Sequence, residues 1–445
     1  MQYKFIYNIH GGISMINKIE KKISTKVDFY SIVNTMSKAM DLISETVVGH
    51  HKVVAYISLR LGIELNLDRE EIHKLLIASL VHDMGVFYLD QNFSDLTFDK
   101  TDNRHALIGY ELSKGLFPER EIAEIIKHHH HEYGDDDKEV PYLSHIIHLA
   151  DRIAVILKEQ DTVFQQTNNI KEVVNNNSGI RFWPKAVEKF NNLCESEAFW
   201  LDTFFEDRIE KWLKDYCINW NLDLKELLDI GILISHIIDF RSAFTATHSQ
   251  GVAKMSSLLA EKLKFSHKDV KLMEIAGYFH DIGKLAIPTR ILNKPGKLNK
   301  EEWQLMKTHT YYTYKAMDIS PQLERIKKWA SFHHEKLNGE GYPFHCEGEE
   351  LDLGSRIMAV ADVFTAITED RPYRDKMNLD KVKQILDEIG NNRYLDKEVT
   401  AVVLDNIAEF NDVRQHSQRK AERYYQDFHD RVEKLEDKDL LVINS

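Results

Sequence analysis

The 445-residue chain repeats one pattern of histidines and aspartates in its two halves. In each half a single histidine stands 32 residues before a His-Asp pair: His50 before His82-Asp83, and His248 before His280-Asp281. Another histidine, a histidine cluster ending in glutamate, and an aspartate in an apolar stretch follow in the same order: His105, 128–132 and Asp151, then His309, 333–335 and Asp362. Such a repeat predicts two similar structural units in tandem.

Helical spacing surrounds the repeated histidines. Both His50 and His248 open a stretch in which apolar residues recur three or four positions apart. The low content of proline and glycine, 8 and 19 residues, excludes collagen-like and proline-rich chains. We therefore expect an all-α protein of two tandem helical domains. The predicted boundaries are 1–200 for the first domain, 201–240 for a helical connection, 241–413 for the second domain and 414–445 for a charged C-terminal helix or tail.

Charge and cysteine usage narrow the range of partners. The net charge of −13 opposes binding to nucleic acid or to an anionic membrane. The scattered Cys194, Cys217 and Cys346 form no CxxC motif, which argues against a disulfide framework and a thiolate zinc site. The longest apolar stretch, near 227–240, is too short to span a bilayer, and the N-terminus lacks a secretory pattern. We expect a cytoplasmic protein that could form a homodimer or bind a signalling protein through its helical segments.

The second half gathers imidazole and carboxylate groups suited to metal binding. Its candidate ligands are His248, His280, Asp281, His309, His333, His334 and Asp362. Such a set suits iron, manganese, nickel or zinc, and it exceeds the needs of one tetrahedral ion. Two divalent ions about 3.5–4 Å apart can activate water and clamp a phosphoryl displacement, which predicts phosphate ester hydrolysis. The competing interpretations are a helix N-cap for Asp281 and a structural salt bridge for Asp362.

Four segments of the second half carry further motifs. They are HDIGKLAIP at 280–288, ILNKPGKL at 291–298, HHEKLNGEGYP at 333–343 and ADVFTAITEDRPYR at 361–374. Together, over about 241–410, they resemble the signature of HD-GYP domains, a branch of the HD phosphohydrolase superfamily. The resemblance implies an all-helical fold and a bi- or trinuclear metal centre. It also implies hydrolysis of a cyclic dinucleotide, usually cyclic di-GMP, to the linear dinucleotide or to mononucleotides in second-messenger signalling.

The resemblance also assigns roles to individual residues. It makes the seven candidate ligands hold the metals, with Asp281 bridging them and Lys284 contacting the scissile phosphate or helping to protonate the leaving oxygen. Gly341, Tyr342 and Pro343 would form a loop beside the metals, and Arg371 and Arg374 would clamp the second phosphate or a guanine edge. Because 241–247 contains no acidic residue, two metals are favoured over three. Iron or manganese is expected, with nickel or zinc as alternatives.

The first half keeps a ligand set but lacks two of these features. The set is His50, His82, Asp83, His105, His130 and Asp151. Val86 stands where the second half has Lys284, and no GYP loop follows the histidine run. Equal spacing from Pro118 and Pro321 pairs His130 with His333, although a slip of one residue fits almost as well. We interpret the first half as a partly degenerate HD domain that can bind metal but has a regulatory or structural role.

Several functional hypotheses remain open at this stage. The first is a phosphodiesterase for cyclic di-GMP. The hybrid cyclic GMP-AMP is the alternative substrate, because Thr247, Tyr312 and Thr313 depart from the usual HD-GYP pattern near the site. The second is a non-catalytic cyclic dinucleotide sensor, which the intact Lys284 and GYP loop disfavour. The third is an HD phosphohydrolase for ordinary nucleotides, which the GYP and RPYR motifs disfavour.

Overall fold

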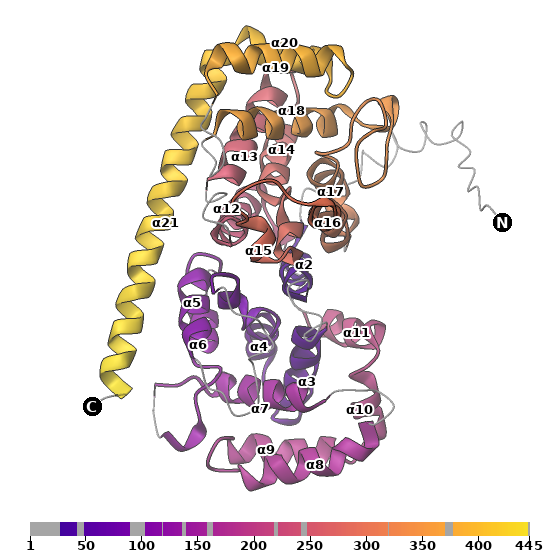
Figure 1. Ribbon diagram of the computed structural model, residues 1–445. Helices are drawn as coiled ribbons and strands as arrows, with labels where there is room; N and C mark the ends of the chain where they lie inside the picture. Colours follow the sequence, from indigo (N-terminus) through magenta and orange to yellow (C-terminus); the bar gives the residue numbers. More distant parts are fainter. Residues whose placement is uncertain are drawn as a thin grey trace, which may run out of the picture.

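The computed structural model describes residues 27–41, 49–89, 103–117, 119–135, 139–157, 163–217, 221–241, 247–318, 320–369 and 377–443. Within these ranges nearly all regular structure is helical, and the only strands are two short pieces, β1 (Val27–Asp28) and β2 (Asn221–Leu222). The predicted all-α fold is therefore confirmed (Figure 1). No helix in the described part of the chain is both long enough and apolar enough to cross a membrane.

The two halves present equivalent helices in the same order. The first half contains α2 (Phe29–Asp41), α3 (His50–Glu64), α4 (Arg69–Val81), η4 (Met84–Phe87), α5 (Arg104–Ser113), α6 (Arg120–Lys127) and α7 (Tyr142–Ile156). The corresponding second-half elements are α12 (Leu224–Phe240), α13 (His248–Lys262), α14 (His267–Phe279), η8 (Ile282–Ala286), α16 (Lys300–Met317), α17 (Glu324–Ser331) and α18 (Leu353–Thr368). The sequence repeat is thus a repeat of structure.

Additional elements distinguish the halves. The first half adds η6 (Tyr133–Asp135), α8 (Val163–Asn176), α9 (Pro184–Leu193), α10 (Glu197–Asp202) and α11 (Glu206–Tyr216). The second half adds α15 (Thr289–Leu292), η9 (Pro321–Leu323), η10 (Gly348–Glu350), α19 (Leu379–Asn391), α20 (Lys397–Asp405) and α21 (Ile407–Ile443). Within the stretch predicted as a connection, α11 packs on α3 and α4, whereas α12 packs on α13 and α14.

Local sequence signals set where several of these helices begin. Asp68 caps α4 and Asp223 caps α12, and in each case a glutamate three residues later bonds back to the capping residue. Asn299 caps α16 in the same way. Each of these capping boxes satisfies backbone N–H groups that would otherwise lack a partner in the first turn.

The same close backbone approach holds the histidines together in both halves. A Cβ atom on Gly85 would lie 1.9 Å from the carbonyl oxygen of His105, and one on Gly283 would lie 1.9 Å from that of His309. Only glycine fits where two backbones approach so closely. The glycine two residues after each His-Asp pair therefore brings the helix of the third histidine, α5 or α16, against the pair.

The halves join as one body. β1 pairs with β2 in antiparallel register, with Val27 opposite Leu222. Each strand leads into a helix that reaches across: α2 contacts η8 and α16 of the second half, and α12 contacts η4 of the first. Buried apolar residues of both halves form one continuous core. Figure 1 shows α21, in yellow, running from the second half along the side of the first, where it contacts α5.

Candidate metal and phosphodiester site

The second half brings all seven predicted metal ligands to one place. His248 opens α13, His280 and Asp281 follow α14, His309 lies in α16, His333 and His334 follow α17, and Asp362 lies in α18. Six of them are buried, and the seventh, His334, is partly exposed. Five separate helices therefore contribute to one largely buried cluster of imidazoles and carboxylates.

The carboxylate of Asp281 lies between two groups of histidines. One oxygen, Oδ2, lies 3.1 Å from Nε2 of His280, and the other, Oδ1, lies 3.5 Å from Nε2 of His309 and 3.9 Å from Nε2 of His333. The ligand atoms fall into two sets that could each hold an ion: His248, His280 and Asp281, and His309, His333 and His334. This arrangement suits a carboxylate that bridges two neighbouring cations.

Asp362 closes the other side of the cluster. Its Oδ1 lies 3.1 Å from Nε2 of His248, and its Oδ2 lies 3.7 Å from Nδ1 of His334. Burial raises the pKa of Asp362, but the hydrogen bond from His248 and the charges of the surrounding histidines outweigh burial and hold that pKa well below its ordinary value. Asp362 is thus available as an anionic ligand and is no isolated core carboxylate.

Three of the histidines are oriented by their own helices. Nδ1 of His280 lies 2.7 Å from the carbonyl of Gly277, and the corresponding distances are 2.6 Å from His309 to Met306 and 2.7 Å from His333 to Ala330. A carbonyl accepts only from a protonated ring nitrogen, so each Nδ1 carries the hydrogen and each Nε2 is left with a lone pair. Those Nε2 atoms point into the cluster, as ligand nitrogens must.

Two observations show that this cluster fits divalent cations. Among the described residues, Nε2 of His280 and Oδ1 of Asp281 are buried without a hydrogen-bond partner. Such atoms are rare and costly unless something binds them. In addition, burial lowers the pKa of His309 to about 3, and the charges of His280 and Lys284 outweigh burial and hold the pKa of Asp281 well below its ordinary value. Neutral imidazoles and ionised carboxylates are the forms that bind metals. His248 differs, because burial lowers its pKa but the carboxylates of Glu369 and Asp362 outweigh burial and raise that pKa to about 10, so a cation at His248 would displace a proton.

Lys284 lies at the edge of the cluster. Its Nζ is 2.5 Å from Oδ2 of Asp281, and its side chain is 19% exposed. The equivalent position in η4 is Val86, which is buried. Of these two equivalent positions, only the one in the second half therefore holds a partly exposed cation next to the predicted bridging carboxylate.

The predicted GYP loop lies beside the metal ligands. The ring of Tyr342 is centred 4.9 Å from that of His334, and its backbone N–H bonds the His334 carbonyl. A Cβ atom on Gly341 would lie 2.4 Å from Cα of Glu335, so this position needs glycine. Pro343 completes the turn, whose following backbone N–H groups at Phe344 and Cys346 bond the Glu335 carboxylate. Arg371 and Arg374 lie outside the described residues.

Some neighbours of the site were not identified from the sequence. Oε2 of Glu369 lies 3.0 Å from Nδ1 of His248, and Trp303, which is 47% exposed, lies edge-on to Tyr342 with ring centres 6.0 Å apart. Nζ of Lys307 lies 5.9 Å from the centre of the Tyr342 ring. Glu369 falls within the ITEDRPYR motif, which could have drawn attention to it, whereas nothing in the sequence singles out Trp303 or Lys307.

The first half builds a closely similar cluster. Asp83 Oδ2 lies 3.2 Å from Nε2 of His82, and Asp83 Oδ1 lies 3.4 Å from Nε2 of His105. Nε2 of His50 lies 3.0 Å from Oδ1 of Asp151. Two sets of ligand atoms are again close enough to hold an ion: Asp83, His105, His129 and His130, and His50, His82 and Asp151. Every first-half candidate from the sequence thus lies in the cluster.

The histidine run has a different register from the one that proline spacing predicts. His129, rather than His130, matches His333: its Nδ1 lies 2.6 Å from the carbonyl three residues earlier, and its Nε2 lies 3.2 Å from that of His105. His130 takes the place of His334. The fold preserves the interval of 24 residues from the preceding single histidine, and α6 and α17 begin equally far from that histidine. In the sequence, however, Pro118 stands two residues before α6 and Pro321 three residues before α17.

The first-half cluster also differs chemically from the second. His51 is fully buried, and its Nε2 lies 3.4 Å from Oδ2 of Asp83, the oxygen equivalent to the one that Lys284 contacts. Arg152 is buried as well, with Nη2 2.5 Å from Oδ2 of Asp151. The first cluster therefore has an additional imidazole and a buried guanidinium, and it lacks the partly exposed lysine.

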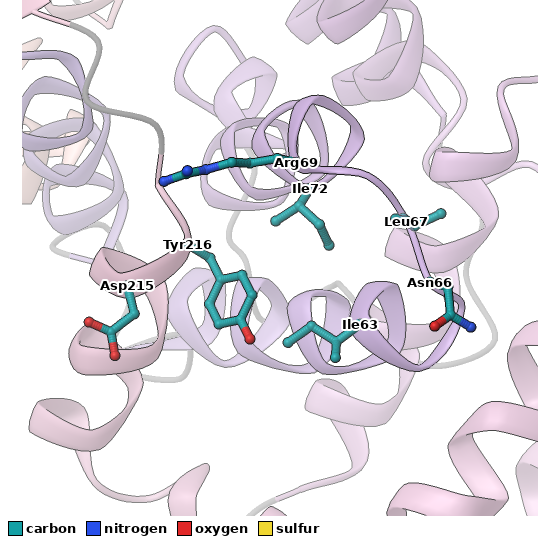
Figure 2. A pocket seen from close by; sticks show the side chains of 7 residues that line it. All are labelled: Ile63, Asn66, Leu67, Arg69, Ile72, Asp215 and Tyr216. Carbon is teal, nitrogen blue, oxygen red and sulfur yellow. The ribbon is translucent and has the colours of Figure 1, made fainter.

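One hollow in the described part of the structure lies away from both clusters. Figure 2 shows this cavity of about 630 Å³. Its lining residues are Ile63, Asn66, Leu67, Arg69, Ile72, Asp215 and Tyr216. Ile63 is 13 residues along α3 from His50, or about 20 Å at the helical rise. The hollow contains no histidine or cysteine and is separate from both clusters.

Comparison with known families identifies the two halves. Family models described as HD domains match residues 47–156 and 233–399. The chain belongs to the HD-domain proteins. Its two HD domains stand in tandem, and the second carries the HD-GYP motifs, so the predicted resemblance is confirmed. The clusters described above could hold the metal ions on which such domains depend.

Curated relatives align with this chain to different extents. The chain is similar to 3′3′-cGAMP-specific phosphodiesterase 1 of Vibrio cholerae, with 29% identity over 409 residues, 88% of this chain and 94% of the relative. It is 35% identical over 247 residues to 3′3′-cGAMP-specific phosphodiesterase 3 of the same organism, covering 54% of each chain. It is 32% identical over 206 residues to a cyclic di-GMP phosphodiesterase of Thermotoga maritima, covering 44% of this chain and 55% of the relative.

A solved structure supports the fold. A crystal structure of a cyclic GMP-AMP specific phosphodiesterase from V. cholerae matches with a TM-score of 0.61 and 23% identity, covering 86% of this chain and 98% of that one. At this level of identity the match supports the architecture alone. The arrangement of two helical HD domains therefore has a solved counterpart.

Proposed function

We propose that the second HD domain is a metal-dependent phosphodiesterase that hydrolyses a cyclic dinucleotide. The observation that carries the proposal is the carboxylate of Asp281, whose two oxygens face separate histidine groups while Lys284 lies beside it. Two divalent cations, iron or manganese, would be held by the seven clustered ligands, and when bound they would activate water and offset phosphate charge. The relatives named above support this class of substrate.

The chain's own residues would position and protonate the substrate. In hydrolysis, the oxygen of water bonds to phosphorus, the bond from phosphorus to the ribose 3′-oxygen breaks, and that oxygen takes a proton. Lys284 is placed to donate a hydrogen bond to the phosphate or the proton to the leaving oxygen. Tyr342 and the exposed ring of Trp303 offer aromatic surfaces on which a purine could stack.

The hybrid cyclic GMP-AMP and cyclic di-GMP are the two substrates to distinguish. The sequence motifs alone favour cyclic di-GMP. The relative that aligns over both domains is named for the hybrid, which favours cyclic GMP-AMP for this chain. We therefore infer that the hybrid is hydrolysed faster than cyclic di-GMP.

Turnover of both dinucleotides tests the proposal directly. The full chain is purified without oxygen, loaded separately with iron(II) or manganese(II), and the products are separated by chromatography. We expect hydrolysis of the hybrid at the higher kcat/KM and a loss of at least about 10³-fold in the Asp281→Ala variant. If the metal-loaded protein bound either dinucleotide tightly but formed no product, the protein would be a cyclic dinucleotide sensor and the proposed activity would be wrong. Undiminished turnover by Asp281→Ala would contradict the assigned centre.

For the first HD domain we propose metal binding without comparable turnover. Its cluster keeps seven ligand residues in nearly the same geometry. Val86 offers no proton and no positive charge to a phosphate, and His51 lies at the oxygen of Asp83 that corresponds to the lysine-bound oxygen of Asp281. A regulatory or structural role follows, because the site can hold charge but cannot stabilise a leaving oxygen as Lys284 would.

A further inference from the structure

A row of buried polar side chains leads from the C-terminal helix α21 to a metal ligand of the second domain. Gln418 on α21 donates through Nε2 to Oε1 of Glu369. The other oxygen of Glu369 lies 3.0 Å from Nδ1 of His248, whose Nε2 lies 3.1 Å from Asp362. Gln418 and Glu369 are each 8% exposed, and His248 is 2% exposed. The row therefore lies inside the protein, where such contacts are strong.

His248 needs an external partner because of its place in its helix. His280, His309 and His333 each bond a carbonyl three residues earlier in the chain. His248 is the first residue of α13, so α13 itself has no earlier turn that could supply such a carbonyl. Glu369, directly after the end of α18, takes this role with a carboxylate. A carboxylate behind a ligand imidazole fixes its orientation and raises its basicity.

Arg414 fixes the direction of the row. Its Nη1 donates to Oε1 of Gln418 at 2.5 Å, and a guanidinium can only donate. The amide oxygen of Gln418 must therefore face Arg414, which leaves the amide nitrogen to donate to Glu369. Glu369 in turn must accept from His248, so Nδ1 of His248 carries a hydrogen. Nε2 of His248 bonds Asp362 in this structure, and a cation bound there would take the place of the proton on Nε2. Hydrogen positions along the row thus follow from Arg414.

Tight packing of α21 against the domain makes this contact available. A Cβ atom on Gly251 of α13 would lie 2.9 Å from Nε2 of Gln418 and 2.8 Å from Cγ2 of Thr365. Ser417, the neighbour of Gln418, has its Oγ 3.3 Å from the carbonyl of Gln250. The absence of a side chain at Gly251 is what allows α21 to bring the amide to Glu369.

We propose that Glu369 and Gln418 are positioning residues for His248, so that metal retention by the second domain depends on the C-terminal helix. The inference rests on the proposed role of His248 as a metal ligand. It adds that a residue on a helix outside the repeated unit sets the tautomer of that ligand. Removing a partner of this kind typically lowers metal affinity about 10–100-fold.

Metal affinity of matched variants tests the proposal. Manganese(II) affinity is measured by chelator competition on the full chain, in the unaltered background and with Asp83→Ala to silence the first domain. We expect Glu369→Ala and Gln418→Ala to weaken binding by about 10–100-fold. Ser417→Ala, which alters the adjacent buried residue but not the row, serves as the control and should bind like the unaltered chain. The thermal midpoint of each metal-free variant reports on folding.

An exchanged pair separates positioning from simple packing. In Glu369→Gln, the new amide can present its oxygen to His248 or to Gln418, but not to both. In the double variant Glu369→Gln with Gln418→Glu, residue 369 can accept from His248 and donate to residue 418, which can still accept from Arg414. We expect Glu369→Gln to lose about tenfold in affinity and the double variant to recover most of that loss.

The possible results have distinct meanings. Affinities of Glu369→Ala and Gln418→Ala within twofold of the unaltered chain would overturn the proposal. It would also be overturned if Ser417→Ala lost affinity equally, or if the exchanged pair recovered nothing, because either result indicates a packing defect. Metal retention that follows the row in a protein that hydrolyses neither dinucleotide would uphold this inference while refuting the proposed activity.

Discussion

The clearest contrast between the two domains lies in one pair of residues. Lys284 and Val86 occupy the same place, three residues after the aspartate at the centre of each cluster. Lys284 lies in η8 and Val86 lies in η4. The ammonium of Lys284 contacts Asp281, whereas the first domain meets Asp83 with the imidazole of His51. A difference in charge and proton supply thus arises at one position of an otherwise shared ligand geometry.

Replacing Lys284 by methionine tests its role. The change removes the ammonium but retains most of the side-chain volume, so we expect kcat to fall about 10²–10³-fold with metal content nearly unchanged. Steady-state kinetics and metal analysis of the purified chain provide the measurement. Lys254→Met, which breaks the ion pair with Glu274 away from the cluster, is the matched control. A variant that keeps full kcat would remove Lys284 from the mechanism.

Replacing Asp83 tests the first-domain centre. Asp83 is in contact range of His82, His105 and His129, so Asp83→Ala should abolish metal binding there. Because the proposed chemistry lies in the second domain, we expect bound metal per chain to fall while turnover at saturating metal stays within about threefold. Equal losses of turnover and metal would instead show that the first domain takes part in catalysis or is needed to form the second site.

The sequence predicted residues whose spacing repeats and missed those that meet only through packing. The seven candidate ligands of the second domain stood out because each has a counterpart in the same order in the first half. Gln418 lies 49 residues from Glu369 and 170 from His248, and no periodicity connects them. The register of His129 was missed because prolines were used as the reference point, and Pro118 and Pro321 stand at different distances, two and three residues, before the helices that follow them.

At the scale of elements, a buried charge docks α11 on α3. The side chain of Lys52 is 2% exposed, and its Nζ lies 2.9 Å from Glu210 and 2.5 Å from Glu206. A lysine is rarely buried without carboxylate partners, because removing its charge from water is costly. The two glutamates are one helical turn apart on α11, so they present both carboxylates on one face.

The docking of α11 should depend on pH in a defined direction. Burial raises the pKa of Glu210, but hydrogen bonds from Lys214 and Lys52 outweigh burial and lower that pKa to about 2 from 4.5. A lowered folded-state pKa stabilises the fold above pH 4.5, and the stabilisation is lost as pH falls from 4.5 toward 2. We expect Glu210→Gln to cost about 2 kcal/mol at pH 7 and less at pH 3. Denaturant unfolding across this range measures the difference, and a cost independent of pH would contradict it.

At the scale of the whole molecule, α21 joins the two domains. It packs on α13 of the second domain and on α5 of the first (Figure 1). Near its C-terminal part, Nε of Arg431 lies 3.1 Å from Glu111, and Nδ1 of His429 lies 2.6 Å from the hydroxyl of Tyr88. Together with the paired strands β1 and β2, these contacts fix the domains against each other from two sides.

Phe428 is the apolar centre of this junction. Its replacement should distinguish the role of α21 in joining the domains from its proposed role in metal retention. Phe428 is fully buried, with its ring 5.1 Å from that of Phe240 and 5.4 Å from that of Tyr88. Phe428→Ala leaves a cavity between the domains and should cost about 3–5 kcal/mol of unfolding free energy. Amide hydrogen exchange should accelerate in 421–435.

Metal retention should survive the same change. Gln418 is ten residues before Phe428, about 15 Å along the helix, and it is held by contacts to α13 that Phe428 does not share. We therefore expect Phe428→Ala to keep its manganese(II) affinity within about threefold while Gln418→Ala loses it, because the row through Glu369 stays intact. Asp430→Ala, on the exposed side of the helix, is the control for exchange and stability. If Phe428→Ala lost metal as readily as Gln418→Ala, the position of His248 would depend on the whole of α21 rather than on the contact between Gln418 and Glu369.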